Sequence, residues 1–300
     1  MRAKSSLASM GVDRMERQPL IRAEDVSFQY KGDLGEKVIP ALNQIRLDIY
    51  PGEYVAIIGR NGSGKSTLSK HFNGILQPSR GDVWVDGWNT KEKSRLQEIR
   101  KKVGMVFQNP DNQIIATTVE DDVAFGLENI QVPPEEMDER IDAALRLAGL
   151  SSMRRRAPYH LSEGQKQRLA IAGVIAMRPA CLVLDEATSR LDTYGRRELL
   201  RVIRRLNEGG MAIVTVTHHM SEAAEADRVI VLDEGSIVLQ GPPREVFQKQ
   251  AFLQERQLDV PAASRIAGMV HERCPSFRPD LIDSDEVAGE VRRLIGEGEK

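Results

Sequence analysis

The sequence has only two cysteines in 300 residues, and one of them, Cys181, lies inside an apolar segment. So few cysteines exclude a disulfide framework, and a reducing cytosol is the simplest compartment to expect. Long apolar runs are also missing: the longest, from Leu169 to Met177, has nine residues counting Gly173. A membrane-spanning helix needs about 20 such residues, so we expect a chain that does not itself cross a bilayer.

Neither sign of charge dominates, since the chain has 42 Lys and Arg, 44 Asp and Glu, and a formal net charge of −2. Nucleic-acid-binding proteins are usually basic, so we expect no nucleic-acid partner. Residues 1–19 carry charges but no apolar segment of the kind that a secretory signal requires. We predict that residues 1–20 are a disordered lead before the first structured segment.

A glycine-rich stretch matches the P-loop pattern G-x-x-x-x-G-K-[ST]. The apolar residues 55–58 before it predict a buried strand, and the residues from Leu68 onward can form a helix. In this order the glycines let successive backbone N–H groups point at phosphate oxygens. Lys65 is predicted to reach the β- and γ-phosphates, and the Ser66 hydroxyl to bind Mg²⁺. The predicted phosphate-binding loop comprises Gly59, Arg60, Asn61, Gly62, Ser63, Gly64, Lys65, Ser66 and Thr67.

Three β segments surround this loop in the sequence. Alternating apolar and polar residues predict antiparallel strands over residues 21–30 and 41–50, and a hairpin over residues 81–88. Tyr30 lies at the end of the first strand. Two interpretations of its ring stay open at this point: it packs in the core, or it offers its face to an adenine base.

The apolar residues 103–107 predict another buried strand, which ends at Gln108. Ligands of α/β sheets gather at the carboxyl ends of the parallel strands. A neutral amide at that edge can bind a metal ion or orient a water molecule without adding charge. The alternative is an amide that only caps the loop.

The sequence then becomes helical as far as His160. Thr118 is a predicted N-cap for a helix over residues 119–129, because its hydroxyl can accept a bond from the first turn. A second helix is predicted over residues 135–148. No strand interrupts this block, so we predict a helical subdomain, at about residues 109–160, inserted into the sheet domain.

A further helix start follows at Leu161–Gln165. Ser162 is its predicted N-cap, and Gly164 leaves the first turn unobstructed. A hydroxyl, bare backbone N–H groups and the positive end of the helix dipole form a second anion site. One chain cannot easily bring this site and the P-loop to the same phosphate, whereas two chains can. We therefore expect the protein to work as a pair of chains.

Two further strands are predicted to end in chemically active side chains. The strand over residues 181–184 leads into Asp185, which we predict to hold Mg²⁺, and Glu186, which can polarise a water for in-line attack on a γ-phosphate. The strand over residues 211–217 leads into His218, which can bond to a γ-phosphate and sense its presence. The alternatives are a surface turn with acids and a structural histidine.

In order and spacing these motifs resemble those of an ABC-transporter ATPase, over about residues 21–250. The resemblance implies that the chain hydrolyses ATP with Mg²⁺. It makes Tyr30 the adenine-stacking aromatic, Gln108 the Q-loop residue at the Mg²⁺, and Glu186 the catalytic base. Its other implied contacts to the nucleotide are the signature residues Ser162, Gly164 and Gln165, acting on a neighbouring chain, the D-loop residue Asp192 and the switch histidine His218.

Within that class, the segments 108–113, 117–126 and 165–173 resemble the ATPase subunit of energy-coupling factor (ECF) importers, the cobalt and vitamin uptake group. The resemblance implies a peripheral protein on the cytoplasmic face of the cell membrane. Its implied partners are a second ATPase, a copy or more readily a relative, a transmembrane T component and a substrate-binding S component. The alternatives are the ATPase of another ABC transporter, or an ABC ATPase outside transport.

The implied fold class is α/β: a P-loop NTPase of the ABC ATPase type with a parallel core sheet, an antiparallel β subdomain, an inserted helical subdomain and a small helical C-terminal extension. We place the ATPase domain at residues 21–245. The extension at 246–300 resembles a segment that is implicated in ATPase pairing.

Four residues depart from the family's usual pattern. Glu163 replaces the second-position glycine of the signature and puts a carboxylate near a neighbouring chain's γ-phosphate. We expect its side chain to project into solvent and activity to survive. Arg190 stands for the usual small or apolar residue of the D-loop, Thr193 for the common proline, and His219 for a frequent aspartate.

Overall fold

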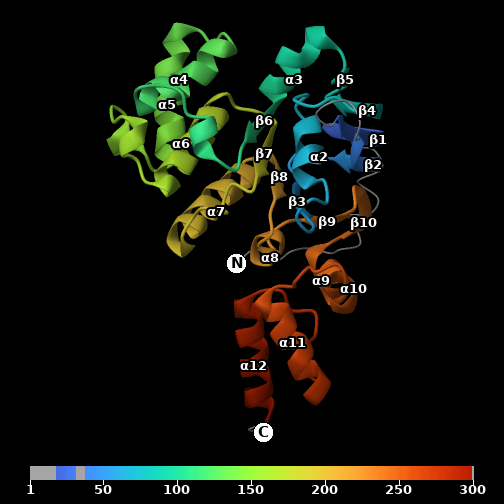
Figure 1. Cartoon of the computed structure of the whole chain (residues 1–300). Coiled ribbons are helices and arrows are strands. Elements are labelled where there is room, and N and C mark those ends of the chain that lie inside the picture. The colour runs from blue at the N-terminus through green and yellow to red at the C-terminus, as the bar shows by residue number, and fades with distance from the viewer. Residues whose placement is uncertain (1–17, 32–37, 299–300) are drawn as a thin grey trace.

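The computed structural model describes residues 18–31 and 38–298 of the chain. Its centre is a six-stranded sheet in the order β10-β9-β3-β8-β7-β6 (Figure 1). Five strands are parallel, and β10 pairs antiparallel with β9 at one edge. The strands are β3 (Tyr54–Ile58), β6 (Val103–Val106), β7 (Cys181–Asp185), β8 (Ala212–Val216), β9 (Arg228–Asp233) and β10 (Ser236–Gly241).

Both faces of this sheet are covered, because every residue of β3, β6, β7 and β8 is buried. Successive side chains of a strand point to opposite faces. Thus Val55 and Ile57 pack on the face covered by α2 (Lys65–His71) and by the antiparallel sheet, whereas Ala56 and Ile58 pack on the other, helical face. This two-sided burial explains why the strands appear in the sequence as continuous apolar runs.

The second sheet is antiparallel, with four strands in the order β2-β1-β4-β5. Its turn at Asp86 and Gly87 has positive φ at both residues, as a tight type I′ hairpin requires. The predicted antiparallel β subdomain and its hairpin are confirmed. The predicted lead falls outside the described residues except for residues 18–20. The strands are β1 (Ile21–Lys31), β2 (Val38–Ile49), β4 (Arg80–Val85) and β5 (Trp88–Asn89).

Helices α4 (Val119–Asn129), α5 (Pro134–Leu147) and α6 (Glu163–Ala176) pack on one another beside the parallel sheet (Figure 1). Thr118 caps α4 as predicted, since its hydroxyl accepts a bond from the backbone N–H of Asp121 at 3.2 Å. The cap satisfies one of the free N–H groups of the first turn and sets where the helix begins.

The remaining helices lie outside this group. They are α3 (Leu96–Lys102), α7 (Thr193–Glu208), α8 (Met220–Ala223), α9 (Pro243–Gln248), α10 (Gln250–Glu255), α11 (Ala262–Arg273) and α12 (Ser284–Gly298), with 3₁₀ turns at Lys93–Arg95, Pro110–Asn112, Ser151–Met153 and Pro158–His160. Across residues 18–31 and 38–298, no helix combines the length and apolar character that a membrane crossing needs.

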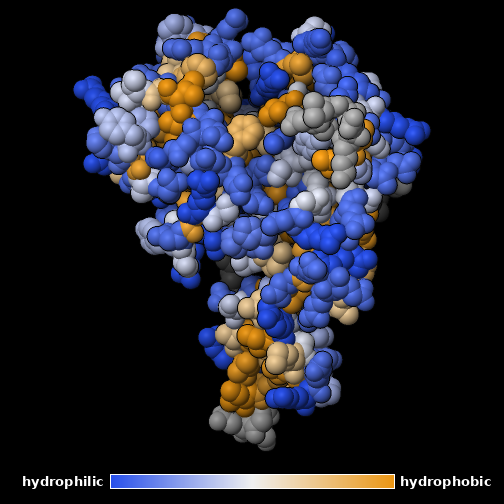
Figure 2. Space-filling model, in the orientation of Figure 1, coloured by the Kyte–Doolittle hydropathy of each residue, from blue (hydrophilic) through white to orange (hydrophobic). Residues whose placement is uncertain are grey.

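Helices α11 and α12 form a hairpin that extends away from the two sheets (Figure 1). A small core of Ala267, Phe277 and Leu281 holds the hairpin together. Its outer surface carries exposed apolar side chains, seen in orange at the lower end of Figure 2. They are Ile266 and Met269 on α11 and Val291 and Ile295 on α12. A monomeric protein rarely leaves such side chains grouped in solvent, so this surface is a candidate interface.

Candidate nucleotide site

The P-loop lies between β3 and α2, at the carboxyl edge of the parallel sheet. Gly64 has φ +101°, and a Cβ atom there would lie 2.4 Å from the carbonyl oxygen of Ala41, so only glycine fits. The Lys65 ammonium donates hydrogen bonds to the carbonyl oxygens of Gly59 at 2.8 Å and Arg60 at 3.0 Å. Burial lowers the pKa of Lys65. The loop thus holds a partly desolvated cation against its own backbone, which suits it to bind phosphate.

Ser66 and Asp185 meet although 119 positions separate them in the sequence, since the Ser66 hydroxyl donates to the Asp185 carboxylate at 2.8 Å. Burial raises the pKa of Asp185, while the Ser66 hydrogen bond opposes that rise. A buried carboxylate is stabilised by a cation beside it. A hydroxyl and one carboxylate are oxygen ligands of the kind that Mg²⁺ takes together with substrate phosphates and water. These two residues therefore fit a magnesium ion.

The described residues contain no group of three or more His, Cys, Asp or Glu side chains that could hold a metal ion.

Glu186 lies just beyond the end of β7, with a neighbouring side chain on each side. The Gln108 amide, beyond β6, donates to Glu186 Oε2 at 2.7 Å. His218 Nδ1, beyond β8, lies 3.9 Å from the same oxygen. Glu186 has φ +51°, and its backbone N–H donates to the carbonyl of Val216 at 2.9 Å, which holds the chain in this disfavoured conformation. Three predicted site residues thus converge at one edge of the sheet, as expected for parallel strands.

The amide nitrogen of Gln108 faces Glu186, so a metal ion would be bound by its other atom, the amide oxygen. The sequence left two alternatives open for this residue, a contact to a metal ion or water and a cap of its own loop. In the structure the side chain joins two strand ends, and the loop behind it is held by Gln113, whose Oε1 accepts from the backbone N–H of Phe107 at 3.3 Å. Gln108 is thus oriented toward the site and does not cap its own loop.

Tyr30 is not part of the core: 39% of the residue is exposed. Its hydroxyl lies 3.1 Å from the Thr67 hydroxyl. The Tyr30 and Phe28 rings meet edge to face, with their centroids 4.9 Å apart. The Tyr30 ring therefore lies beside the P-loop helix with an accessible surface. This position is compatible with an adenine contact.

The start of α6 has the predicted cap. The Ser162 hydroxyl accepts from the backbone N–H of Gln165 at 3.3 Å, and the Gln165 side chain accepts from the backbone N–H of Ser162 at 2.9 Å. At Gly164, an added Cβ would come no nearer than 3.7 Å to any atom, that atom being on Leu191. Asp192 caps α7 in the same way, accepting from the backbone N–H of Gly195 at 2.7 Å. Both helix starts are thereby fixed in place.

One buried acid that supports the site, Glu222 on α8, was not predicted from the sequence. Its carboxylate accepts from the Thr217 hydroxyl at 2.7 Å and lies 3.4 Å from Arg196 Nε. Burial raises the pKa of Glu222. The residue positions the loop that carries His218. In the sequence it is one of several acids in an ordinary polar helical stretch, so no pattern distinguishes it.

His219 lies beside His218, with ring centroids 4.1 Å apart, and its backbone N–H donates to the Thr217 hydroxyl at 3.0 Å. Burial, and after it the charges of Arg196 and His218, lowers the pKa of His219 to about 4. The ring is therefore neutral at pH 7.

Acid is expected to destabilise the fold through His219. The unfolded side chain has a pKa of about 6.5, so below that pH the unfolded chain binds more protons than the folded one. The contribution of His219 to stability is complete above about pH 6.5 and is lost as the pH falls toward 4. The fall in Tm between pH 7 and pH 4.5 should be smaller for His219→Gln than for the wild type. His160→Gln, which replaces an exposed histidine, should show the same fall in Tm as the wild type. An equal fall in all three proteins would contradict the role given to His219.

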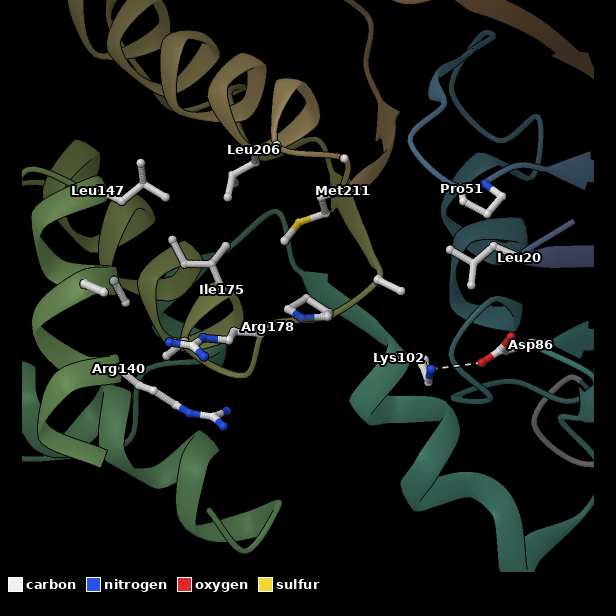
Figure 3. A pocket seen from close by; sticks show the side chains of 17 residues that line it. Leu20, Pro51, Asp86, Lys102, Arg140, Leu147, Ile175, Arg178, Leu206 and Met211 are labelled. Carbon is white, nitrogen blue, oxygen red and sulfur yellow. Dashed lines mark ion pairs between the residues drawn. The ribbon is translucent and has the colours of Figure 1, made fainter. Parts of the chain in front are cut away.

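A separate cavity of about 560 Å³ opens at the amino ends of β6, β7 and β8, the edge away from the P-loop (Figure 3). Apolar side chains such as Leu147, Ile175 and Leu206 form part of its wall. Its three cations each pair with a carboxylate: Lys102 with Asp86 at 2.9 Å, Arg140 with Glu136 at 2.7 Å and Arg178 with Glu139 at 3.8 Å. With those charges already matched, the cavity has no evident means of binding a polyphosphate.

A P-loop beside a strand-end acid and glutamine, with a capped signature-like helix on the same chain, defines an ATPase of the ATP-binding cassette class. The family model described as ABC transporter matches residues 42–189. The chain also superposes on the cassette MJ0796, solved as a dimer in a post-hydrolysis state bound to ADP and Pi, with a TM-score of 0.68 and 32% identity over 74% of this chain and 98% of that one.

The similarity to curated relatives narrows the class. The chain is 47% identical to the energy-coupling factor transporter ATP-binding protein EcfA1 of Clostridioides difficile, over 92% of this chain and 99% of that protein. It is 49% identical to the EcfA1 of Bacillus subtilis, over 93% and 99%. Among solved structures, cbiO1 of Clostridium perfringens, part of the ABC transporter complex cbiONQ, has a TM-score of 0.71 and 36% identity over 85% of this chain and 99% of that one.

The chain belongs to the family of energy-coupling factor transporter ATP-binding proteins. The resemblance inferred from the sequence motifs and the predicted ABC ATPase fold class are both confirmed. The chain is thus an ATPase of the kind that is coupled to transport.

Proposed function

We propose that this chain binds ATP with Mg²⁺ and hydrolyses it to drive an ECF-type importer of a micronutrient, a vitamin or a transition-metal ion. The observation that carries the proposal is the convergence at one sheet edge. There the Ser66–Asp185 pair lies beside the P-loop, and Glu186 is held by Gln108 with His218 close by.

Each residue has a distinct role in the proposed hydrolysis. Lys65 exchanges its bonds to two loop carbonyls for bonds to the β- and γ-phosphates. Glu186 accepts the proton of the attacking water, and Gln108 keeps its carboxylate in place. His218 contacts the γ-phosphate, and Tyr30 contacts the adenine. Bound Mg²⁺, held through Ser66 and Asp185, would neutralise phosphate charge as the bond to the leaving group breaks.

The second anion site suggests how two chains share one ATP. Ser162, Gly164 and Gln165 begin a 14-residue helix whose dipole adds positive charge at that end. In the proposed pair, this helix start closes over the nucleotide in the neighbouring chain's P-loop, with Asp192 nearby. MJ0796, a relative of similar fold, was solved as a dimer. We propose that the neighbouring chain is a related ATPase rather than a second copy.

We propose the following division of the chain. Residues 21–245 form the ATPase domain, with a helical subdomain at about 109–160, and residues 246–300 form an extension for ATPase pairing. The exposed apolar surface of α11 and α12 supports that last assignment, because a second ATPase would cover it. The pair would lie on the cytoplasmic face of the membrane, bound to the T and S components.

A groove on α4 is the proposed contact with the T component. Ile115 is 61% exposed and Phe125 47% exposed on its apolar floor. Asp121 and Glu128 line the same groove, so a basic segment of the membrane protein would match it in charge. The groove follows the Q-loop along the chain, so a movement at Gln108 can pass to the membrane partner.

Replacing Phe125 by aspartate is expected to release the chain from its membrane partner, because a charge would be buried where an aromatic side chain packs. The test is co-purification in detergent from the organism's own membranes, using tagged chains at native level. Recovery of the transmembrane protein should fall about tenfold or more, since loss of a central aromatic anchor typically costs at least 2 kcal/mol. Nucleotide binding by the purified chain should not change.

Val238→Asp is the matched control, because Val238 is an exposed apolar residue on β10, outside the groove. It should co-purify the transmembrane protein in wild-type amount. Equal recovery with Phe125→Asp and with the wild type would show that the membrane protein binds elsewhere on the chain.

A further inference from the structure

The first residue of α6, directly after Ser162, is a glutamate. A carboxylate at this end of a helix stabilises the helix, because it offsets the positive end of the dipole. For the same reason it weakens the site for any other anion. The exposed Glu163 side chain therefore poses a problem for a helix start that is proposed to bind a γ-phosphate.

Two cations lie on either side of that carboxylate. Lys166 Nζ is 3.6 Å from Glu163 Oε1, and Arg190 Nη1 is 4.0 Å from Glu163 Oε2. Arg190 comes from the loop between Glu186 and Asp192, 27 positions further along the chain. Its Nη1 also donates to Asn109 Oδ1 at 3.4 Å. The Glu163 carboxylate thus lies between a cation of its own helix, Lys166, and a cation of the D-loop, Arg190.

Lys166 cannot neutralise Glu163 alone. Its shorter contact is with Asp111, at 2.8 Å, and this contact is the first cause of the raised pKa of Lys166. The two acids carry two negative charges against one positive charge on Lys166. Arg190 brings this local set to neutrality.

We propose that Arg190 is a positioning residue of the shared ATP site. It holds the Glu163 carboxylate on the D-loop side and cancels its charge, so that the N-terminus of α6 at Ser162 stays positive toward the neighbouring chain's γ-phosphate. This inference rests on the proposed function. In one exposed chain such a contact stabilises little. When a second chain covers it and excludes water, the same charges interact more strongly.

The test is a double-mutant cycle in the purified transporter complex, with the wild type, Arg190→Ala, Glu163→Gly and the two changes combined. Arg190→Ala should raise the KM for ATP about fivefold or more, which corresponds to a coupling of about 1 kcal/mol. In the Glu163→Gly background the same change should alter KM less than about twofold. Arg190→Lys should restore most of the wild-type KM, and Arg190→Gln should not.

The Tm of the isolated chain and its own affinity for ATP serve as readouts that a general structural defect would move; both should stay unchanged in Arg190→Ala. An equal rise of KM in the two backgrounds, or no rise in either, would overturn the inference. Failure of the proposed function has a different signature, namely full turnover in a complex that carries Glu186→Gln.

Discussion

Replacing Glu186 by glutamine is expected to lower ATP turnover by about 10²- to 10⁴-fold, the usual contribution of a general base. Glutamine has nearly the same shape, and its side-chain oxygen can still accept the bond that Gln108 donates to Glu186 Oε2. It cannot accept a proton from water. Steady-state ATPase activity should therefore collapse while equilibrium binding of ATP is retained.

Glu139→Gln removes an equivalent charge from an exposed glutamate, so turnover by that control should match the wild type. Mixed with the related ATPase, the Glu186→Gln protein should also accumulate as a pair of ATPase chains in ATP and Mg²⁺, visible as an increase in mass that ADP does not cause. Undiminished turnover in Glu186→Gln would remove the residue from the role of base and, with it, the proposed mechanism.

Replacing Lys65 by alanine is expected to remove ATP binding and hydrolysis together, whereas Glu186→Gln removes hydrolysis and keeps binding. The ammonium is largely desolvated, which lowers its pKa, so its attraction for a polyphosphate is little screened. Removing one partner of such a charge pair costs about 2–5 kcal/mol, or roughly 30- to several-thousand-fold in affinity. Calorimetric titration with ATP and Mg²⁺ measures this directly.

Lys65 also bonds to the carbonyls of Gly59 and Arg60, so the fold of the variant needs its own check. The Tm without nucleotide should lie close to that of Lys93→Ala, a control at an exposed lysine that should bind ATP normally. Near-normal affinity in Lys65→Ala would mean that the P-loop backbone alone accounts for nucleotide binding.

Local patterns in the sequence predicted much of the fold. The helix starts at Thr118 and Ser162 were predictable because each hydroxyl accepts a hydrogen bond from a backbone N–H only three residues further along the chain. The buried strands were predictable because both faces of the parallel sheet are covered, which leaves unbroken apolar runs. The P-loop needed only its own pattern between a strand and a helix.

What the sequence could not predict depends on contacts between distant segments. It placed Gln108 at a strand end, but not its amide nitrogen on Glu186, because a side-chain rotation leaves no trace in the sequence. The prediction that Glu163 projects into solvent was correct, since the side chain is exposed. The sequence did not predict that Lys166 and Arg190 would lie within 4.0 Å of its carboxylate. Glu222 was missed because only the fold brings it to Arg196 of α7.

The central claim is that this chain supplies ATP-driven motion to a membrane importer, and the most direct test identifies what it binds in its own cell. The tagged chain would be purified in detergent at native level, and its partners identified by mass spectrometry. We predict a second, related ATPase together with small multi-spanning membrane proteins, one of which binds the imported solute. Recovery of the chain alone, or of a nucleic-acid-bound assembly, would contradict the transport function and leave only the ATPase chemistry.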